Sequence, residues 1–298
     1  MTDEELRDGH AVQVPAPGVR TPGMSLVLAL RLVHPFPSVL DGAATAAIGA
    51  AAGGAPATAL RLGLAMILIQ FAIGATNDVV DAPFDRGRPA KPVAAGVVSP
   101  RTATAVAIGC ALAGLGLVVP SGLPCLAIAV AGLGVGLGYD LRLKRTPWAW
   151  LALAVAIPLL VVFAWYGATG TVDPLLAVST PIAGLAGASL AIGNALVDPD
   201  HDRRTGATTP VVAFGPETAW RAAFALQVST AVAAAASLAA IGGEPVAVAA
   251  ALAAGALAVA GFVPMRAGRV ARRERGWEIQ AIGVALLGTI WVVGAALR

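Results

Sequence analysis

Residues 57–76 read ATALRLGLAMILIQFAIGAT, and residues 77–86 continue with NDVVDAPFDR. The first segment is almost entirely apolar over the roughly 20 residues that a helix needs to cross the hydrocarbon core of a bilayer. The second places Asn77, Asp81 and Asp85 at steps of four residues, so a helix would carry them along one face. A membrane-spanning helix that ends in a row of oxygen-bearing side chains is the pattern from which the fold and the site are predicted.

The composition of the whole chain is typical of a membrane protein. Of its 298 residues, 57% are hydrophobic and 12% are charged, whereas soluble domains carry about 25% charged residues. The mean hydropathy is +0.79. Nine apolar runs near the length of a span predict an all-α, polytopic membrane fold with about nine transmembrane helices. These runs are approximately 36–55, 57–76, 102–119, 121–139, 148–167, 174–195, 218–240, 245–264 and 277–297.

Residues 1–24 precede this apolar region and differ from it. They are polar and acidic, with several prolines and glycines. They lack the basic start and apolar centre of a signal peptide, so we interpret them as a flexible cytoplasmic tail. Residues 25–298 then form one transmembrane domain. Cys110 and Cys125 fall within predicted spans, and we interpret them as small core residues rather than as a disulfide.

Basic residues in the connections lie on one side of the predicted domain. The connections after the second, fourth, sixth and eighth spans hold them, and Arg61 is the exception on the other side. By the positive-inside rule these connections are cytoplasmic, with the N-terminus inside and the C-terminus outside the cell membrane. The net charge of +3 follows from this distribution and does not indicate nucleic-acid binding. An aromatic belt at the inner interface is predicted from Trp148, Trp150, Trp220 and Trp277.

The acidic pattern occurs a second time. Residues 193–203 read GNALVDPDHDR and place Asn194, Asp198 and Asp202 at the same four-residue spacing. Asn77 and Asn194, which head the two copies, are the only asparagines in the chain. Both copies follow a span that ends on the cytoplasmic side, so we expect them to reach the same membrane face.

A proline interrupts the second half of each copy, at Pro83 and at Pro199. Proline removes a helical hydrogen bond and disfavours helix at the preceding residue. Each copy is therefore predicted to be a helix end that kinks or unwinds. Irregular backbone at membrane depth is tolerated only where it is buried in protein or lines a wet cavity. We therefore expect the helices to surround a central polar cavity that is open to the cytoplasm.

Two such segments concentrate carboxylates that would repel one another without a counter-charge. Mg²⁺ resolves the repulsion, because it binds one or two carboxylates together with substrate phosphates and water. The alternative is that these aspartates are solvated loop residues, which two matching copies disfavour. Neighbouring basic residues add a phosphate site, although the topology alone explains some of them. The acids are Asp78, Asp81, Asp85, Asp198, Asp200 and Asp202, and their neighbours are Arg86, Arg88, Lys91, Tyr139, Arg142, Lys144, Arg145, Arg203 and Arg204.

Three polar residues lie around the start of the first predicted span, namely Arg31, His34 and Asp41. An aspartate a turn or more inside a span is costly unless it faces an interior cavity, so Asp41 is a candidate site residue. His34 precedes a proline and is interpreted as interfacial rather than catalytic. The basic cluster from Arg266 to Arg275 is interpreted as a topology signal that contacts anionic lipids.

Together these motifs resemble those of the UbiA superfamily of intramembrane prenyltransferases. Asn77, Asp78, Asp81 and Asp85 match its N-D-x-x-D-x-x-x-D motif, and KPVAAG at 91–96 is similar to the segment that follows it. The second acidic copy resembles the family's D-x-x-x-D region. Tyr139 and the LKRTPW segment of residues 143–148 match the tyrosine and lysine between the two motifs. The resemblance covers roughly residues 28–297.

The resemblance implies transfer of a prenyl group from an allylic prenyl diphosphate to a lipophilic or aromatic acceptor, through an allylic carbocation. Two Mg²⁺ ions would bridge the diphosphate to both acidic copies. The implied metal ligands are Asn77, Asp78, Asp81, Asp85, Asp198 and Asp202. The implied catalytic residues are Asp81, Asp85, Asp198, Asp202, Lys144 and Tyr139. The diphosphate would contact Asn77, Asn194, Arg86, Lys91, Arg203 and Arg31. Asp41 is the candidate residue for contacting the acceptor.

The sequence departs from the family pattern in a compact DRGRPAKP segment at 85–92 and in GATTP at 206–210, which lacks a basic residue. Both bear on acceptor choice and diphosphate binding. Within the family, a terpene cyclase or a polyprenyl-phosphate phosphoribosyltransferase remains an alternative. Outside it, a cation transporter is a distant alternative, because its acids would be expected at mid-span.

Overall fold

The structure, a computed structural model, describes residues 28–297, which are helical and contain no strand. The predicted tail of residues 1–24 lies outside the described residues. The body consists of long helices: α2 (Pro35–Ala51), α3 (Pro56–Asp81), α4 (Pro100–Val118), α5 (Leu123–Gly138), α6 (Trp150–Thr169), α7 (Leu175–Ala195), α10 (Pro216–Ala240), α11 (Pro245–Ala260) and α13 (Val270–Ala296). Short segments lie between them: η1 (Arg31–Val33), η2 (Val119–Ser121), η3 (Tyr139–Leu143), α8 (Pro199–Arg204), α9 (Pro210–Phe214) and α12 (Phe262–Met265).

Eight helical stretches between residues 28 and 297 are long and apolar enough to cross a membrane. They coincide with the second to ninth predicted spans, so the all-α, polytopic fold is confirmed. The first predicted span is α2, whose 17 residues lie at the lower end of the length that a span requires.

Prolines mark the start of many of these helices. α2, α3, α4, α10 and α11 each begin at a proline. Proline suits the first helical turn, because its φ is already helical and the amide hydrogen that it lacks would have no helical partner there. The apolar runs of the sequence are therefore divided into separate helices at predictable points.

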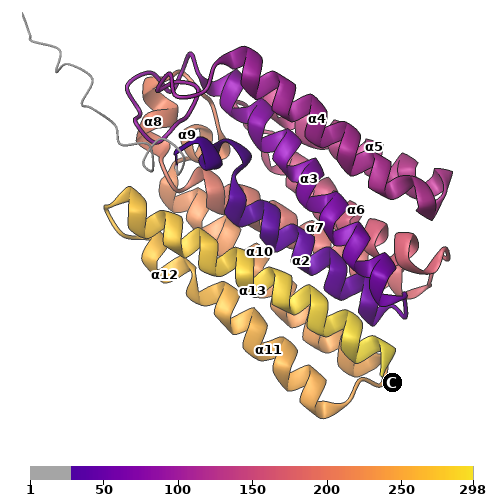
Figure 1. The fold of residues 1–298 in the computed structure, drawn as a ribbon. Coiled ribbons are helices and arrows are strands. Elements are labelled where there is room, and N and C mark those ends of the chain that lie inside the picture. Colours follow the sequence, from indigo (N-terminus) through magenta and orange to yellow (C-terminus); the bar gives the residue numbers. More distant parts are fainter. Residues whose placement is uncertain (1–27, 298) are drawn as a thin grey trace, which may run out of the picture.

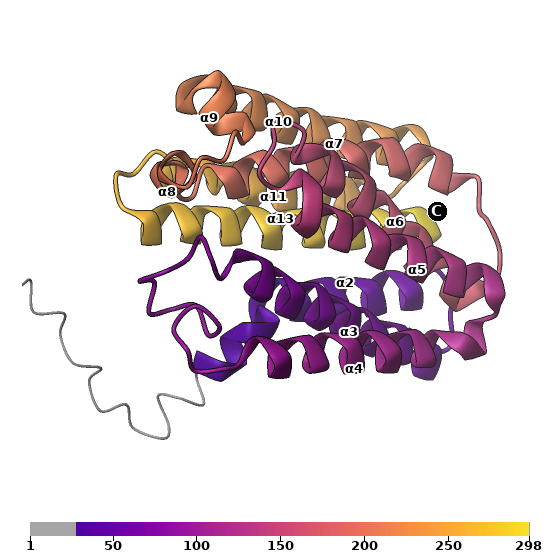
Figure 2. The same cartoon turned by 90° about the horizontal axis from the view of Figure 1, so that it is seen from above.

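The long helices form a ring in which neighbours in sequence pack against each other (Figure 1). The ring closes because α13, the last helix, packs against α2, the first long one. In both views α8, α9 and the loop of residues 82–99 lie at one end of the bundle, and the C-terminus lies at the opposite end (Figures 1 and 2). We call the end with α8 and α9 the site end.

Two glycines allow α2 and α3 to approach closely. A Cβ atom on Gly42 would lie 2.8 Å from the carbonyl oxygen of Gly63, and one on Gly63 would lie 2.7 Å from that of Gly42. Small residues permit such backbone contact in membrane bundles, where lipid supplies no hydrophobic force to press helices together. The close crossing brings Asp41 of α2 beside Gln70 of α3, which donates a hydrogen bond to its carboxylate.

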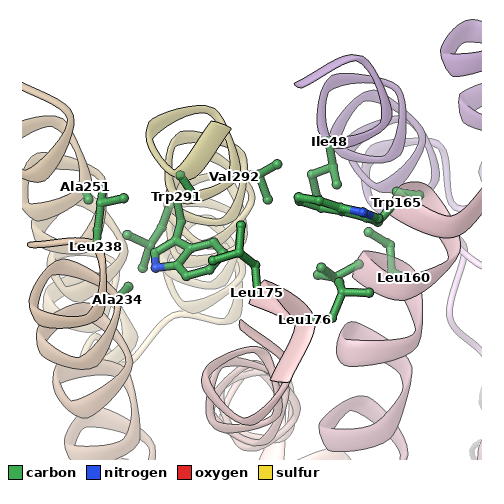
Figure 3. Close-up of a cluster of buried hydrophobic side chains, with 14 of the residues drawn as sticks. Ile48, Leu160, Trp165, Leu175, Leu176, Ala234, Leu238, Ala251, Trp291 and Val292 are labelled. Atoms are coloured by element: carbon green, nitrogen blue, oxygen red, sulfur yellow. The ribbon is translucent and has the colours of Figure 1, made fainter. Parts of the chain in front are cut away.

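An apolar cluster fills the bundle away from the site end. Figure 3 shows Trp165 of α6 and Trp291 of α13 in this cluster, together with Ile48 of α2 and Leu175 of α7. The indole nitrogen of Trp291 donates to the hydroxyl of Ser237 on α10 at 2.9 Å, so its one polar atom is satisfied. Five helices are thereby tied together at this depth.

A buried polar contact ties α7, α10 and α13 nearer the site end. The amide nitrogen of Gln280 donates to Ser189 at 2.9 Å and to Gln227 at 3.0 Å. The Ser189 hydroxyl donates in turn to the carbonyl of Ala223 at 2.8 Å. Hydrogen bonds of this kind between membrane helices contribute about 0.6 kcal/mol each on average, so the contact orients the helices more than it stabilises them.

Candidate active site

The first acidic segment begins inside α3 and continues beyond it. Asn77 and Asp78 are buried near the end of α3, and the helix ends at Asp81, two residues before Pro83. Asp85 lies in the turn that follows, where it is again buried. The predicted unwinding of this segment at its proline is confirmed.

The second acidic segment is divided between two helices. α7 ends one residue after Asn194, which is exposed. α8 begins at Pro199, and Asp198 caps it by accepting the amide hydrogen of His201 at 3.2 Å. Asn194 and Asp198 therefore belong to different helices, although their four-residue spacing suggests a single face.

Arg88 and His201 connect the two segments. The guanidinium of Arg88 lies 3.3 Å from Asp85 Oδ1 and 3.0 Å from Asp198 Oδ2. His201 Nε2 lies 3.2 Å from Asp85 Oδ1. The two acidic segments, expected from topology to reach one face, thus meet at the site end of the bundle.

The loop of residues 82–99 turns back over the end of α3. The amide of Val93 donates to Asp78 Oδ2 at 2.8 Å. The ammonium of Lys91 lies 3.5 Å from Asp85 Oδ2 and 3.8 Å from Asp78 Oδ1. Asp78 therefore fixes the loop, and Lys91 supplies counter-charge to two buried carboxylates, which would be strongly disfavoured if unpaired.

A π-helical turn, η3, brings a third group of residues to the end of α3. The amide of Lys144 donates to the carbonyl of Tyr139 at 2.8 Å, five residues away. In an α-helix these side chains would point about 140° apart, whereas the wider turn places them on one side. The ammonium of Lys144 forms an ion pair with Asp81. Asp140 accepts a hydrogen bond from Asn77 Nδ2 at 2.7 Å.

Arg145 connects this turn to the segment after α8. Its guanidinium lies 3.8 Å from the ring centre of Phe84 and donates to the carbonyl of Thr205. The Arg145 carbonyl accepts from the amide of Thr208 at 2.9 Å. Thr209 then donates through its hydroxyl to Asp202 Oδ2 at 3.1 Å. The three polar segments form one connected network.

Burial and charge shift several pKa values outside the spans. Burial lowers the pKa of Lys144, but the carboxylates and the tyrosine around it outweigh burial and raise the pKa above its ordinary value. Burial raises the pKa of Asp202, although the bond from Thr209 acts against it. Burial, with Lys91 and Lys144 nearby, lowers the pKa of His34 from 6.5 to about 4. His34 is thus neutral at pH 7 and lies beside the site, not apart from it.

Other candidate residues lie outside this network. Arg86 and Arg31 are exposed, and Arg203 pairs with exposed Asp200 at 2.7 Å. Asn194 makes no side-chain hydrogen bond with another of residues 28–297. Asp41 lines an apolar cavity inside the bundle.

Asp140 and His201 were not among the candidate site residues, but the structure places both in this network. Arg88, rather than the predicted Arg86, lies between the two acidic segments. Asp140 and His201 each lie in a segment that the sequence had already marked. The signal for Asp140 was its position directly after Tyr139. Its contact with Asn77 depends on the π-helical turn, which sequence spacing does not predict.

The side chains of the site fit Mg²⁺ that binds together with a phosphate. Within residues 28–297, no group of three or more His, Cys, Asp or Glu side chains forms a complete metal site. Mg²⁺ needs only one or two carboxylates when phosphates and water supply the rest. Asp78 Oδ1 and Asp140 Oδ2 are buried without a hydrogen bond. Hydrogen bonds within the protein therefore do not occupy all of the carboxylate oxygens that could bind a metal ion.

A comparison with protein families identifies the class of protein. The chain matches the UbiA prenyltransferase family over residues 40–295. It therefore belongs to that family and is an integral membrane prenyltransferase. No curated protein matches the sequence.

Solved structures of low sequence identity share the fold. One, described as digeranylgeranylglyceryl phosphate synthase in membranes, superposes with a TM-score of 0.66 at 14% identity, covering 92% of this chain and 99% of that one. A UbiA homologue from Archaeoglobus fulgidus bound to GPP and Mg²⁺ gives 0.68 at 19% identity, covering 89% and 99%. The same homologue bound to DMAPP and Mg²⁺ gives 0.69 at 19%, covering 89% and 98%.

Proposed function

We propose that this chain transfers a prenyl group from a prenyl diphosphate to a lipophilic or aromatic acceptor, with Mg²⁺ as cofactor. The observation that carries the proposal is the contact of the two acidic segments through Arg88 and His201. It gathers carboxylates and cations at the site end of an otherwise apolar bundle, as a ligand with a charged head and an apolar tail requires. The Archaeoglobus fulgidus homologue bound to GPP or DMAPP with Mg²⁺ supports the same ligand class.

The proposed roles follow the position of each residue. Lys91 and Lys144, which pair with acids of the first segment, would contact diphosphate oxygens. Arg88 would do so from between the two segments. Two Mg²⁺ ions would be held by Asn77, Asp78, Asp81, Asp85, Asp198 and Asp202. Asn194, Arg86, Arg203 and Arg31 remain predicted diphosphate contacts at the exposed edge of the site.

In the proposed reaction, the bond between the allylic carbon and the diphosphate oxygen breaks, and its electron pair leaves with the diphosphate. Bound Mg²⁺ would neutralise the charge that develops on this leaving group. Lys144 is held beside Asp81 by its ion pair, so its charge is already in place and needs little reorganisation. The acceptor attacks the allylic carbon and releases a proton. Apolar walls exclude the water that would otherwise capture the cation.

The proposed orientation places the site end in the cytoplasm, with the N-terminus inside and the C-terminus outside the cell membrane. The connections at the opposite end contain Asp173 and Glu244 but no basic residue within the described part of the chain. This asymmetry supports the orientation by the positive-inside rule. Single cysteines at Arg269 and Gly242, in a variant without Cys110 and Cys125, should be labelled from inside and outside respectively. Reversed labelling would contradict the orientation.

The reaction is tested with labelled geranylgeranyl or farnesyl diphosphate and a panel of acceptors in membranes that contain the protein. Activity should require Mg²⁺ and disappear in EDTA. Asp81→Ala and Asp198→Ala should each reduce turnover by about a hundredfold or more, the order expected when a group that stabilises developing charge is lost. Asp200→Ala is the control, because Asp200 is exposed and, among residues 28–297, pairs only with Arg203.

Magnesium-independent turnover, or full activity in both active-site variants, would exclude the mechanism. The same assay without acceptor distinguishes the cyclase alternative, because a cyclase would still form a cyclic hydrocarbon from the labelled diphosphate.

A further inference from the structure

An apolar cavity of about 110 Å³ lies inside the ring, between α2, α6, α7, α10 and α13. Aliphatic side chains and Trp291 make up most of its wall, and Figure 3 shows several of those that line its deeper part. Among its lining residues Asp41 is the one ionisable group, and Ser179 and Thr230 are the other polar ones. The hydroxyl of Thr230 already donates to the carbonyl of Leu226 at 2.8 Å. Asp41 therefore dominates the polarity of this cavity.

Asp41 faces the part of the cavity nearest the site end. α2 begins beside the site at His34 and carries Asp41 about two turns further into the bundle. The amide of Gln70 donates to Asp41 Oδ2 and so fixes its carboxyl group. Gln70 precedes Asn77 by seven residues on the same helix, a rise of about 10 Å on nearly the same face. In the proposed complex, a reacting carbon and a small acceptor headgroup would lie along this distance between Asp41 and the diphosphate.

The charges of the lining residues restrict what the headgroup can be. The wall that residues 28–297 form holds no lysine, arginine or histidine. A carboxylate or phosphate placed there would be removed from water without a counter-charge and would lie beside a second acid, and both effects are unfavourable. A hydroxyl or amine instead donates a hydrogen bond to Asp41. A neutral or basic headgroup therefore fits the cavity, and an anionic one does not.

We propose that Asp41, positioned by Gln70, is the acceptor-binding residue of this protein and selects acceptors whose headgroup is neutral or basic and donates an O–H or N–H hydrogen bond. The proposal rests on the proposed function, and it excludes aromatic acids and phosphate-bearing acceptors. It defines the class of acceptor, which the motifs shared across the family do not identify.

The test is direct binding, so it does not depend on turnover. The probes are naphthol and hydroxynaphthoic acid, which share a ring system and a hydroxyl and differ by a carboxylate. Each is titrated calorimetrically into the full-length protein in nanodiscs, with Mg²⁺ and a non-hydrolysable prenyl thiodiphosphate. Naphthol should bind at least tenfold more tightly than the acid. Equal or tighter binding of the acid, or no binding of naphthol, would overturn the proposal.

Variants assign the selectivity to Asp41. Asp41→Leu and Asp41→Asn should each weaken naphthol binding at least tenfold and reduce the preference over the acid, and Gln70→Leu should have a smaller effect in the same direction. Thr289→Val is the matched control, because Thr289 lies on α13 outside the cavity wall and its hydroxyl is bonded to the carbonyl of Ala285 at 2.9 Å. If Asp41→Leu does not fold, Asp41→Asn, which keeps the shape of the side chain, decides. An unchanged preference in folded Asp41→Asn contradicts the proposal.

The prenyl thiodiphosphate separates this proposal from the proposed function. If the protein fails to bind the thiodiphosphate with Mg²⁺, the proposed function is wrong whatever the probes do. If it binds the thiodiphosphate but shows no preference for naphthol, the proposed function stands and the assignment of Asp41 is wrong.

Discussion

Arg88 and Asp198 lie 3.0 Å apart, although 110 residues separate them in the sequence. The contact joins the loop after α3 to the residue that caps the start of α8. The side chain of Arg88 is 38% exposed and that of Asp198 is 22% exposed, and ion pairs with such access to water contribute only about 0–1 kcal/mol to stability. The contact therefore matters for where it holds the two acidic segments rather than for how much it stabilises the fold.

Arg88, rather than Arg86, is expected to carry diphosphate binding at this junction. Arg88→Ala should raise KM for the prenyl diphosphate by about tenfold, because a guanidinium that can form two charge-assisted hydrogen bonds is lost. Arg86→Ala should have a smaller effect, since Arg86 is exposed and forms no ion pair within residues 28–297. Steady-state kinetics on the two variants makes the comparison. A larger effect at Arg86 would restore the assignment that follows from the resemblance.

Asp140 is expected to act through Asn77. The hydrogen bond from Asn77 Nδ2 to Asp140 turns the amide oxygen of Asn77 away from Asp140, where a metal ion or water can use it. Asp140→Leu should weaken Mn²⁺ affinity about 10- to 100-fold, the range for residues that orient metal ligands. Asp140→Asn should retain most of the affinity, because its carbonyl oxygen still accepts the bond. Mn²⁺ titration followed by electron paramagnetic resonance measures both variants, and equal losses would favour a role of charge instead.

His34 is expected to make the folded protein sensitive to acid. Its pKa falls from 6.5 to about 4 because it is buried, with Lys91 and Lys144 nearby. A depressed histidine pKa means that the stabilising contribution is complete above pH 6.5 and is lost as the pH falls through 4. Thermal unfolding between these pH values should show a steeper loss for the native chain than for His34→Asn. Asparagine is the suitable replacement, because His34 has a φ of 46° and asparagine tolerates that conformation. Equal slopes would contradict this prediction.

The close crossing of α2 and α3 is expected to be sensitive to a single methyl group. Gly63→Ala places a Cβ atom 2.7 Å from the carbonyl oxygen of Gly42, so the helices must separate. We expect a loss of about 1–3 kcal/mol, the usual range for overpacking. Gly116→Ala is the matched control, because a Cβ atom there meets nothing within 4 Å. Thermal unfolding in detergent compares the two, and similar midpoints would show that the crossing can relax.

The sequence predicted most of the fold, because lipid imposes simple rules on it. Apolar runs of bilayer length had to become helices. The structure shows that α3 and α4 begin at Pro56 and Pro100, a signal that the apolar runs alone did not use. The repeated acidic segments were expected to reach one face, and the structure brings them together at the site end. The first predicted span, 36–55, corresponds to α2, which has 17 residues and includes Asp41.

The detailed geometry of the site could not be predicted in the same way. The contact between Asn77 and Asp140 depends on a π-helical turn, and no spacing rule signals one extra residue in a helix. The choice of Arg88 over Arg86 depends on how the loop after Pro83 turns back. Such turns follow from contacts between distant segments, so they are absent from any local pattern.

The network of ion pairs has a consequence for how ligands bind. Four acids of the site already have a cationic partner: Lys144 pairs with Asp81, Lys91 with Asp78 and Asp85, and Arg88 with Asp198. A metal ion alone would take the carboxylates and leave the cations unpaired, and a diphosphate alone would do the reverse. When both ligands bind, the metal ion can pair with these carboxylates and the diphosphate with these cations, so neither group is left unpaired. Mg²⁺ and diphosphate should therefore each increase the affinity for the other by the same factor, because binding coupling is reciprocal.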